Sequence, residues 1–168
     1  MSAPVRPAAR ISYAPIGVVR TPYTELDGMP LQTVAAPDVQ ARVELEPAVH
    51  GALRDLEGFS HLWLIVHLDR IDGWRPEVVP FLDTVARGVL ATRSPRRPNP
   101  IGLSLVELEA VEPGALRVRG IDLLDGTPVL DVKPYVPLFD AREGARDGWF
   151  AQAAERVHEI RSDDRYGR

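Results

Sequence analysis

The chain has 168 residues, 45% of them hydrophobic, which is enough for one globular domain with a buried core. It contains no cysteine, so disulfides, thiolate metal sites and cysteine nucleophiles are excluded. A net charge of −4 gives no general attraction to nucleic acid, and a polyanion would have to meet a local basic patch.

The ends and the apolar runs carry no sign of secretion or membrane insertion. Residues 1–10 hold two prolines and two arginines and lack the apolar core of a signal peptide. The most apolar run, Leu62–Leu68, is too short to span a bilayer. We therefore expect a cytoplasmic protein without membrane contact, whose residues 1–12 form a disordered or irregular arm.

The first half of the chain predicts short strands joined by loops. A loop rich in Gly, Pro and Asp extends to about Pro37, and a short helix begins at Glu46-Pro47 and ends at Gly58. Apolar runs and alternation predict strands at Ile11–Tyr13, Ile16–Arg20 and Val39–Leu45, and a buried central strand at Phe59–Leu68.

The second half continues the strand pattern. The alternation in Ile101–Val111 changes phase near Leu105-Val106, which predicts a β-bulge there. Asp125-Gly126 predicts a hairpin turn. The expected strands are Val78–Phe81, Gly88–Thr92, Ile101–Val111, Leu116–Asp122 and Val129–Val136.

Many short strands without a strand–helix–strand rhythm favour a mainly β fold. We predict a closed or nearly closed antiparallel β-barrel over residues 13–140. A C-terminal helical tail, residues 141–168, places Trp149, Ala153, Val157 and Ile160 on one apolar stripe.

The segment Ala91–Ser104 is the most informative part of the sequence. Its prolines fix the backbone, so the segment is stiff, and three arginines project from it. Arginine suits carboxylates, phosphates and aromatic faces, which indicates a ligand-binding loop. A solvated connector is the alternative, because all but one of the 20 basic residues are arginine.

Acidic and histidine residues offer weaker signals. Asp122 and Asp131, taken as neighbours across a hairpin, are candidates for hydrogen-bond acceptors or a general base. Asp125 is expected to shape the turn. His61 and His67 share one strand face without further metal ligands at suitable spacing, so a buried, hydrogen-bonded histidine is favoured over a metal site.

Several blocks of sequence together resemble one known family. The chain is similar to the TsaA/TrmO family, which are tRNA adenine-N6 methyltransferases that use S-adenosylmethionine on a β-barrel. The blocks that carry the resemblance are Pro15–Tyr23, Leu56–Trp63, Gly88–Pro95, Arg97–Ser104, Asp122–Pro128 and Lys133–Tyr135.

The resemblance implies a function and a set of partners. It implies methylation of the exocyclic N6 of N6-threonylcarbamoyladenosine in the tRNA anticodon loop, by a homodimer that binds S-adenosylmethionine near its interface and uses no metal. Two alternatives remain open: a small-molecule N- or O-methyltransferase on the same barrel, and a non-catalytic S-adenosylmethionine-binding module.

The resemblance also implies site residues. Asp122 and Asp125 are the candidate catalytic residues, as acceptors of the proton that the amine loses, with binding of the ammonium or ribose of the cofactor as their other role. The tRNA contacts are expected from Arg96, Arg97, Asn99, Arg117 and Arg119, because this sequence lacks the Asp-Pro-Arg-Pro-Ala-Tyr motif of longer members. The cofactor-binding residues implied are Pro30, Gln32, His67, Arg93, Leu103, Asp122, Leu123, Leu124, Asp125 and Gly126. Leu31 and Leu68 depart from the arginine and glutamine usual in the family.

Overall fold

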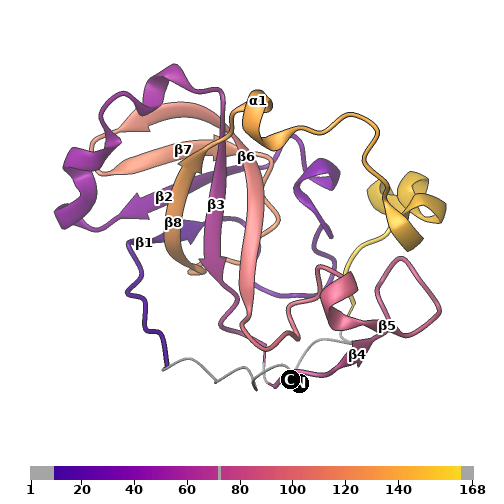
Figure 1. Cartoon of the computed structure of the whole chain (residues 1–168). Coiled ribbons are helices and arrows are strands. Elements are labelled where there is room, and N and C mark those ends of the chain that lie inside the picture. The colour runs from indigo at the N-terminus through magenta and orange to yellow at the C-terminus, as the bar shows by residue number, and fades with distance from the viewer. Residues whose placement is uncertain (1–9, 72, 164–168) are drawn as a thin grey trace, which may run out of the picture.

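The alternating apolar segments close into a six-stranded antiparallel barrel, as predicted, in a computed structural model that describes residues 10–71 and 73–163 (Figure 1). The order of the strands around the barrel is β1-β2-β7-β6-β3-β8. The strands are β1 (Gly17–Arg20), β2 (Gln40–Leu45), β3 (His61–His67), β6 (Ile101–Glu112), β7 (Ala115–Arg119) and β8 (Pro128–Pro134).

One face of each strand fills the barrel interior. In β3 every second residue is fully buried, namely Leu62, Leu64 and Val66, while the intervening side chains point outward. β-Branched and leucine side chains from the other strands complete this core. The core therefore follows from the alternation of side-chain direction along each strand.

A smaller lobe lies beside the barrel. It contains the two-stranded sheet of β4 (Glu77–Val78) and β5 (Arg87–Gly88), and the 3₁₀ helix η4 (Val89–Ala91). The 3₁₀ turns η1 (Thr33–Ala35), η5 (Gly148–Gln152) and η6 (Ala154–His158) lie on the same side of the barrel in Figure 1.

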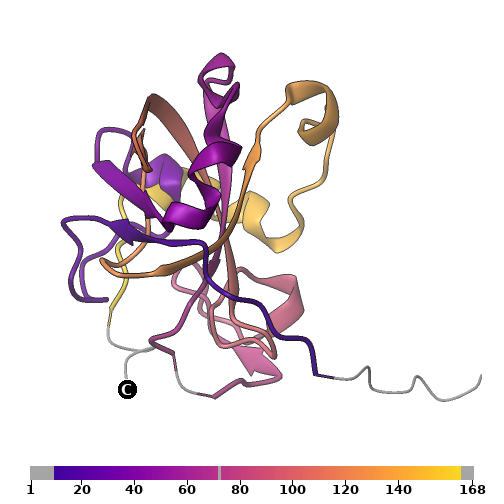
Figure 2. The ribbon, with the colours of Figure 1, turned by 90° about the vertical axis from the view of Figure 1, so that its left-hand side faces the viewer.

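Short helical turns complete the chain. The turns η2 (Pro47–Leu53) and η3 (Leu56–Gly58) join β2 to β3. Helix α1 (Pro137–Asp140) follows β8 and stands clear of the barrel wall in Figure 2. Its Leu138 and Phe139 are exposed.

The structure corrects several predicted elements. Ile11–Tyr13 forms no strand, and η4 replaces the strand expected at Gly88–Thr92. The bulge in β6 lies at Glu109, where pairing with β7 shifts register, and not at Leu105-Val106. The predicted hairpin at Asp125-Gly126 is wrong, because β7 pairs with β2 and β6 whereas β8 pairs with β1 and β3.

Both predicted helices are divided into 3₁₀ turns. The segment 46–58 contains η2 and η3, with Asp55 at a positive φ of 70° between them. In the tail, η5 and η6 replace one continuous helix, yet the stripe of Trp149, Ala153, Val157 and Ile160 packs into a single apolar cluster as predicted. Of the predicted arm, residues 1–9 lie outside the described residues, as do residues 164–168 of the tail.

A substitution at Gly17 tests how closely β1 and β2 pack in the barrel. A Cβ at this position would collide with the carbonyl oxygen of Glu44 on β2. We expect Gly17→Ala to lower the free energy of unfolding by about 1–3 kcal/mol, measured by urea denaturation. Gly51→Ala is the matched control, since a Cβ there has open space, and it should leave the midpoint nearly unchanged. Equal midpoints for the two variants would contradict this account.

Candidate functional site

A difference in strand length leaves the first half of β6 unpaired on its β7 side. β6 has 12 residues and β7 has 5, and β7 pairs with β6 only from Glu107 onward. The chain leaves β7 through Gly120, which has a positive φ of 78°, and turns toward the first half of β6. This path places Asp122 beside Ser104.

The carboxylate of Asp122 is largely shielded from solvent. The buried Ser104 hydroxyl donates a hydrogen bond to Oδ1 of Asp122 at 2.6 Å. Burial raises the pKa of Asp122 to about 6, although the Ser104 hydrogen bond and the charge of Arg93 act in the opposite direction. Asp122 can therefore exchange a proton near neutral pH.

Gln32 and Arg93 form the other half of the site. Nη1 of Arg93 donates to Oε1 of Gln32 at 2.7 Å, and the Gln32 amide donates to the carbonyl of Leu31 at 2.7 Å. Arg93 lowers the pKa of Asp122, so the two charges lie within electrostatic reach. Three residues that the sequence predicted for the cofactor, widely separated along the chain, are thus brought together.

The rest of the Asp122–Gly126 turn is anchored to the barrel. Oδ1 of Asp125 accepts a hydrogen bond from the Thr21 amide at 3.2 Å, and its carbonyl accepts one from Arg70 at 2.7 Å. Leu123 and Leu124 are buried, and their carbonyls accept hydrogen bonds from threonine hydroxyls. These contacts make the turn rigid and leave the Asp122 carboxylate as its group that faces β6.

Other predicted residues lie elsewhere. Pro30 is buried next to Gln32, whereas Leu103 and His67 lie on the outer face of the barrel, on β6 and β3. The expectation of a buried His67 is wrong, because its side chain is exposed. Asp131 is not opposite Asp122: it pairs with Ile65 in the sheet and forms an ion pair of 2.7 Å with Lys133.

The loop of residues 92–100, rich in proline and arginine and called the Pro/Arg loop below, is braced by its own side chains. Nη1 of Arg97 donates to the carbonyls of Thr92 and Ser94 at 2.9 and 3.4 Å, and the Arg96 amide donates to the Ser94 hydroxyl at 3.3 Å. Asn99 is exposed. Part of the arginine chemistry of this loop therefore stiffens the segment that carries Arg93.

Arg117 and Arg119 belong to a ladder of ion pairs on the outside of the barrel. Arg119 bonds both carboxylate oxygens of Glu107, at 2.8 and 2.7 Å, and Arg117 pairs with Glu109 and Glu112. Glutamates thus neutralise much of the positive charge that the sequence assigned to tRNA.

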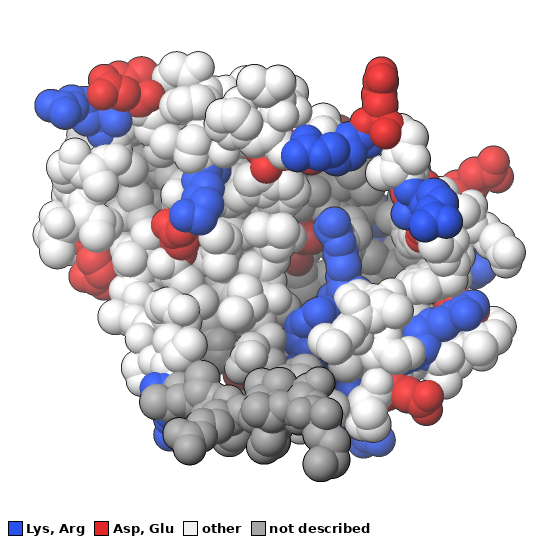
Figure 3. All heavy atoms as spheres, viewed as in Figure 1, with Lys and Arg blue, Asp and Glu red and all other residues white. Residues whose placement is uncertain are grey.

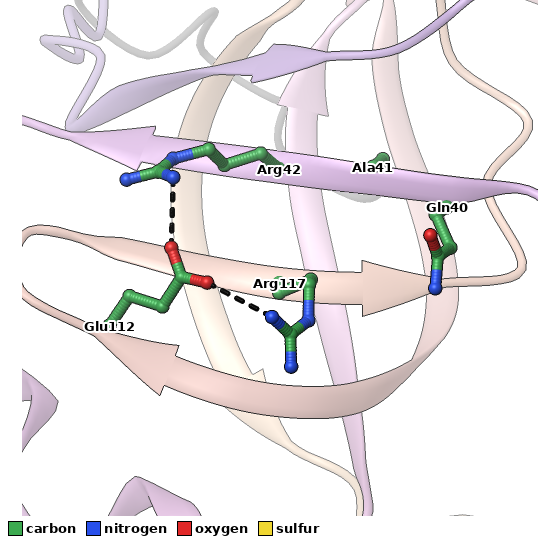
Figure 4. A pocket seen from close by; sticks show the side chains of 5 residues that line it. All are labelled: Gln40, Ala41, Arg42, Glu112 and Arg117. Carbon is green, nitrogen blue, oxygen red and sulfur yellow. Dashed lines mark hydrogen bonds and ion pairs between the residues drawn. The ribbon is translucent and has the colours of Figure 1, made fainter.

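A recess of about 240 Å³ lies in this ladder, lined by Gln40, Ala41, Arg42, Glu112 and Arg117 (Figure 4). Glu112 stands between Arg42 and Arg117, at 2.9 and 3.3 Å. Glu112 lies eight residues beyond Ser104 on β6, roughly 26 Å along an extended strand. The residues that line the recess are different from those around Asp122.

The surface on the side of the lobe differs from the ladder. In Figure 3 basic side chains gather around a hollow between the barrel and the lobe. Residues 10–71 and 73–163 contain no group of three potential metal ligands. The helices of these residues are all too short or too polar to cross a bilayer.

Ser104 is the site residue that the sequence analysis missed. It occupies an inward position of β6, and its hydroxyl is buried among apolar neighbours. The available signal was a single polar residue at an inward-facing strand position, within the segment that already indicated ligand binding.

Comparisons with known proteins agree on one family. Residues 18–141 match the model of the tRNA-methyltransferase O N-terminal domain. A probable S-adenosyl-L-methionine-binding protein of Pyrococcus abyssi is 44% identical over 93% of this chain and 85% of its own length. The tRNA (adenine(37)-N6)-methyltransferase of Escherichia coli is 43% identical over 83% of this chain.

A crystal structure of TrmO from P. aeruginosa superposes with a TM-score of 0.72 at 41% identity, over 85% of this chain. This chain spans 63% of the E. coli enzyme and 62% of the P. aeruginosa chain.

The raised pKa of Asp122 predicts a specific pH dependence of stability. Between its ordinary value of 3.8 and about 6 the folded protein keeps a proton that the unfolded chain has released. The free energy of unfolding therefore falls as pH rises through this window. Asp122→Asn should gain on the order of 1–2 kcal/mol relative to the parent between pH 4 and pH 7.5, measured by urea denaturation. Asp131→Asn is the control and should follow the parent; a constant gap for Asp122→Asn would contradict the assignment.

Proposed function

The chain belongs to the tRNA-methyltransferase O family, and we propose that it is an S-adenosylmethionine-dependent methyltransferase acting on N6 of adenosine 37 in tRNA. One observation carries the proposal: Gln32, Arg93 and Asp122 converge where β6 extends beyond β7. The relatives named for this cofactor and for this reaction support it.

The chemistry of the site fits the cofactor. S-adenosylmethionine has an amino acid end with an ammonium and a carboxylate, and a ribose with two hydroxyls. Asp122 is an acceptor for an ammonium or a hydroxyl, and Arg93 is a donor for a carboxylate. Gln32 orients Arg93 through their 2.7 Å hydrogen bond. When bound, the cofactor would supply a methyl group on a sulfonium, and its sulfur would leave as a neutral thioether when the methyl passes to the acceptor nitrogen.

The protein contributes alignment and a proton acceptor. An exocyclic amine must lose a proton as it gains a methyl group, and a carboxylate with a pKa of about 6 accepts that proton at neutral pH. We propose Asp122 for this role, with the Ser104 hydroxyl fixing its orientation. The turn anchored by Asp125 holds Asp122 in place.

The acceptor that this arrangement suits best is N6-threonylcarbamoyladenosine. Its carbamoyl carbonyl withdraws electron density from N6, so the N6 proton is easier to remove by a carboxylate than that of unmodified adenine. The Pro/Arg loop, with Arg96, Arg97 and Asn99, is the proposed tRNA face. Arg117 and Arg119 would contribute less because glutamates pair with them. Because tRNA is the proposed substrate, we also propose that the protein is cytoplasmic.

A methyl-transfer assay separates the possible functions. Purified protein is incubated with methyl-labelled S-adenosylmethionine and tRNA carrying either N6-threonylcarbamoyladenosine or unmodified adenosine at position 37. We expect label only in the modified tRNA, with a rate that falls steeply as salt rises. Label in unmodified tRNA would contradict the carbamoyl requirement. Transfer only to small metabolites, or cofactor binding without transfer, would support the two alternative functions instead.

We also propose a homodimer formed through the outer face of β3 and β6. Ile101 and Leu103 are about half exposed there, and Leu138 and Phe139 of α1 add further exposed apolar surface. Monomeric proteins seldom expose large contiguous apolar patches. A dimer through this face would place His67 and Leu103, which lie on the outer face of the barrel, at the interface.

Leu103→Glu tests the dimer. We expect the dissociation constant of the dimer to rise at least about tenfold, because a buried charge in the interface lacks a partner. Sedimentation velocity over a concentration series measures the change. Val85→Glu, at an exposed valine outside this face, is the control. A monomeric parent would contradict the proposal.

Arg93→Ala tests the cofactor site. We expect S-adenosylmethionine to bind at least tenfold more weakly, about 1.4 kcal/mol, because the variant lacks the cation that meets the carboxylate. Isothermal titration calorimetry measures this directly. Arg54→Ala removes an exposed arginine on the loop between η2 and η3 and should bind like the parent. Unchanged affinity in Arg93→Ala would exclude Arg93 from the site.

A further inference from the structure

We propose that the segment Gly148–Ser162, here called the strap, positions Gln32 and Arg93 for the cofactor, with Trp149 and Ser162 as its two anchors. This inference rests on the proposed function. The strap follows the residues 18–141 that match the family model. It returns to the lobe and contacts the two segments that carry Gln32 and Arg93.

The first anchor is Ser162, which fixes the segment before Gln32. Its hydroxyl accepts a hydrogen bond from the Met29 amide at 2.9 Å and donates one to the carbonyl of Leu26. Its backbone accepts from Gly28 and donates to Met29, both at 2.9 Å. Arg161 and Pro30 form an antiparallel bridge beside it. The segment just before Gln32 is thus held by hydrogen bonds of its backbone amides and carbonyls, both to the backbone and to the side chain of Ser162.

The second anchor is Trp149, which fixes the segment before Arg93. Its indole Nε1–H donates to the carbonyl of Ala91 at 2.8 Å, two residues before Arg93. The guanidinium of Arg87 lies 5.7 Å from the centroid of the indole ring, and Arg87 is held by Asp83 at 2.7 Å. This cation–π contact and the directional hydrogen bond together fix the ring.

An apolar cluster joins the two anchors. Leu82, Ala153 and Val157 are buried at its centre, and Leu31, Trp149, Phe150 and Ile160 pack around them. Leu31 precedes Gln32 directly, so the departure from the family pattern at position 31 contributes a contact to the strap. The strap therefore links the backbone before Gln32 to the backbone before Arg93, across the hydrogen bond between their side chains.

This geometry gives the strap a role in binding and none in the chemical step. Because Gln32 and Arg93 are already held in position, less conformational entropy is lost when the cofactor binds. A weakened anchor should therefore raise the dissociation constant and KM for S-adenosylmethionine and leave kcat at saturation unchanged.

Trp149→Phe tests the inference, because it keeps an aromatic ring and removes the Nε1–H donor. We expect a threefold to tenfold rise in the dissociation constant and KM for S-adenosylmethionine at unchanged kcat. Hydrogen exchange should become faster in peptides covering residues 26–36 and 87–97 but not in β3. Ser162→Ala should act in the same direction. Trp74→Phe, at a tryptophan that is 56% exposed, is the matched control and should behave like the parent.

Three outcomes would overturn the inference: parent-like affinity and exchange in Trp149→Phe, equal effects in Trp74→Phe, or faster exchange throughout the barrel, which would indicate a general loss of stability. Failure of the parent to bind S-adenosylmethionine would instead overturn the proposed function. Hydrogen exchange in the absence of cofactor would still decide whether the strap orders the two segments.

Discussion

The closure of the barrel by β8 is the constraint on which the other features depend. β8 pairs with β1 along one edge and with β3 along the other, so the sheet hydrogen bonds form a ring. Closure brings β1 and β2 so close together that Gly17 has no room for a side chain. It also fixes where β7 stops relative to β6. The edge of β6 beside Ser104 that β7 does not pair is therefore a consequence of the closed ring and of two unequal strand lengths.

The two halves of the candidate site are held in place by different parts of the structure. Asp122 belongs to a turn that the barrel holds through Thr21 and Arg70. Gln32 and Arg93 belong to loops of the lobe, and side chains of the strap and of the Pro/Arg loop hold them. The acidic group thus rests on the most stable part of the molecule. The basic group rests on a smaller cluster with less buried area, which makes it the more adaptable half of the site.

Local sequence patterns predicted the structural features that depend only on neighbouring residues. A continuous apolar run located β3. Alternation located β2 and β6, and the stripe from Trp149 to Ile160 located the tail contacts, because both depend on side-chain period. Pairing partners were not predictable in this way. Asp125-Gly126 has the residue types of a hairpin turn. Even so, β8 pairs with β1 and β3, which closes the barrel, and not with β7. Residue spacing left Asp122 ambiguous, and only the family resemblance grouped it with Gln32 and Arg93. Ser104 and Trp149 act through contacts between distant segments, which no local pattern contains.

The ion-pair ladder of β2, β6 and β7 affects how a polyanionic partner approaches. Three glutamates oppose three arginines on this wall, so little potential extends from it into solution. The whole chain carries −4, and unpaired basic groups act only within a Debye length of about 8 Å at physiological salt. Long-range attraction cannot orient such a partner before it arrives. Productive encounters would then be governed by random collision, with association rates of about 10⁵–10⁶ M⁻¹s⁻¹ instead of the faster rates of steered complexes.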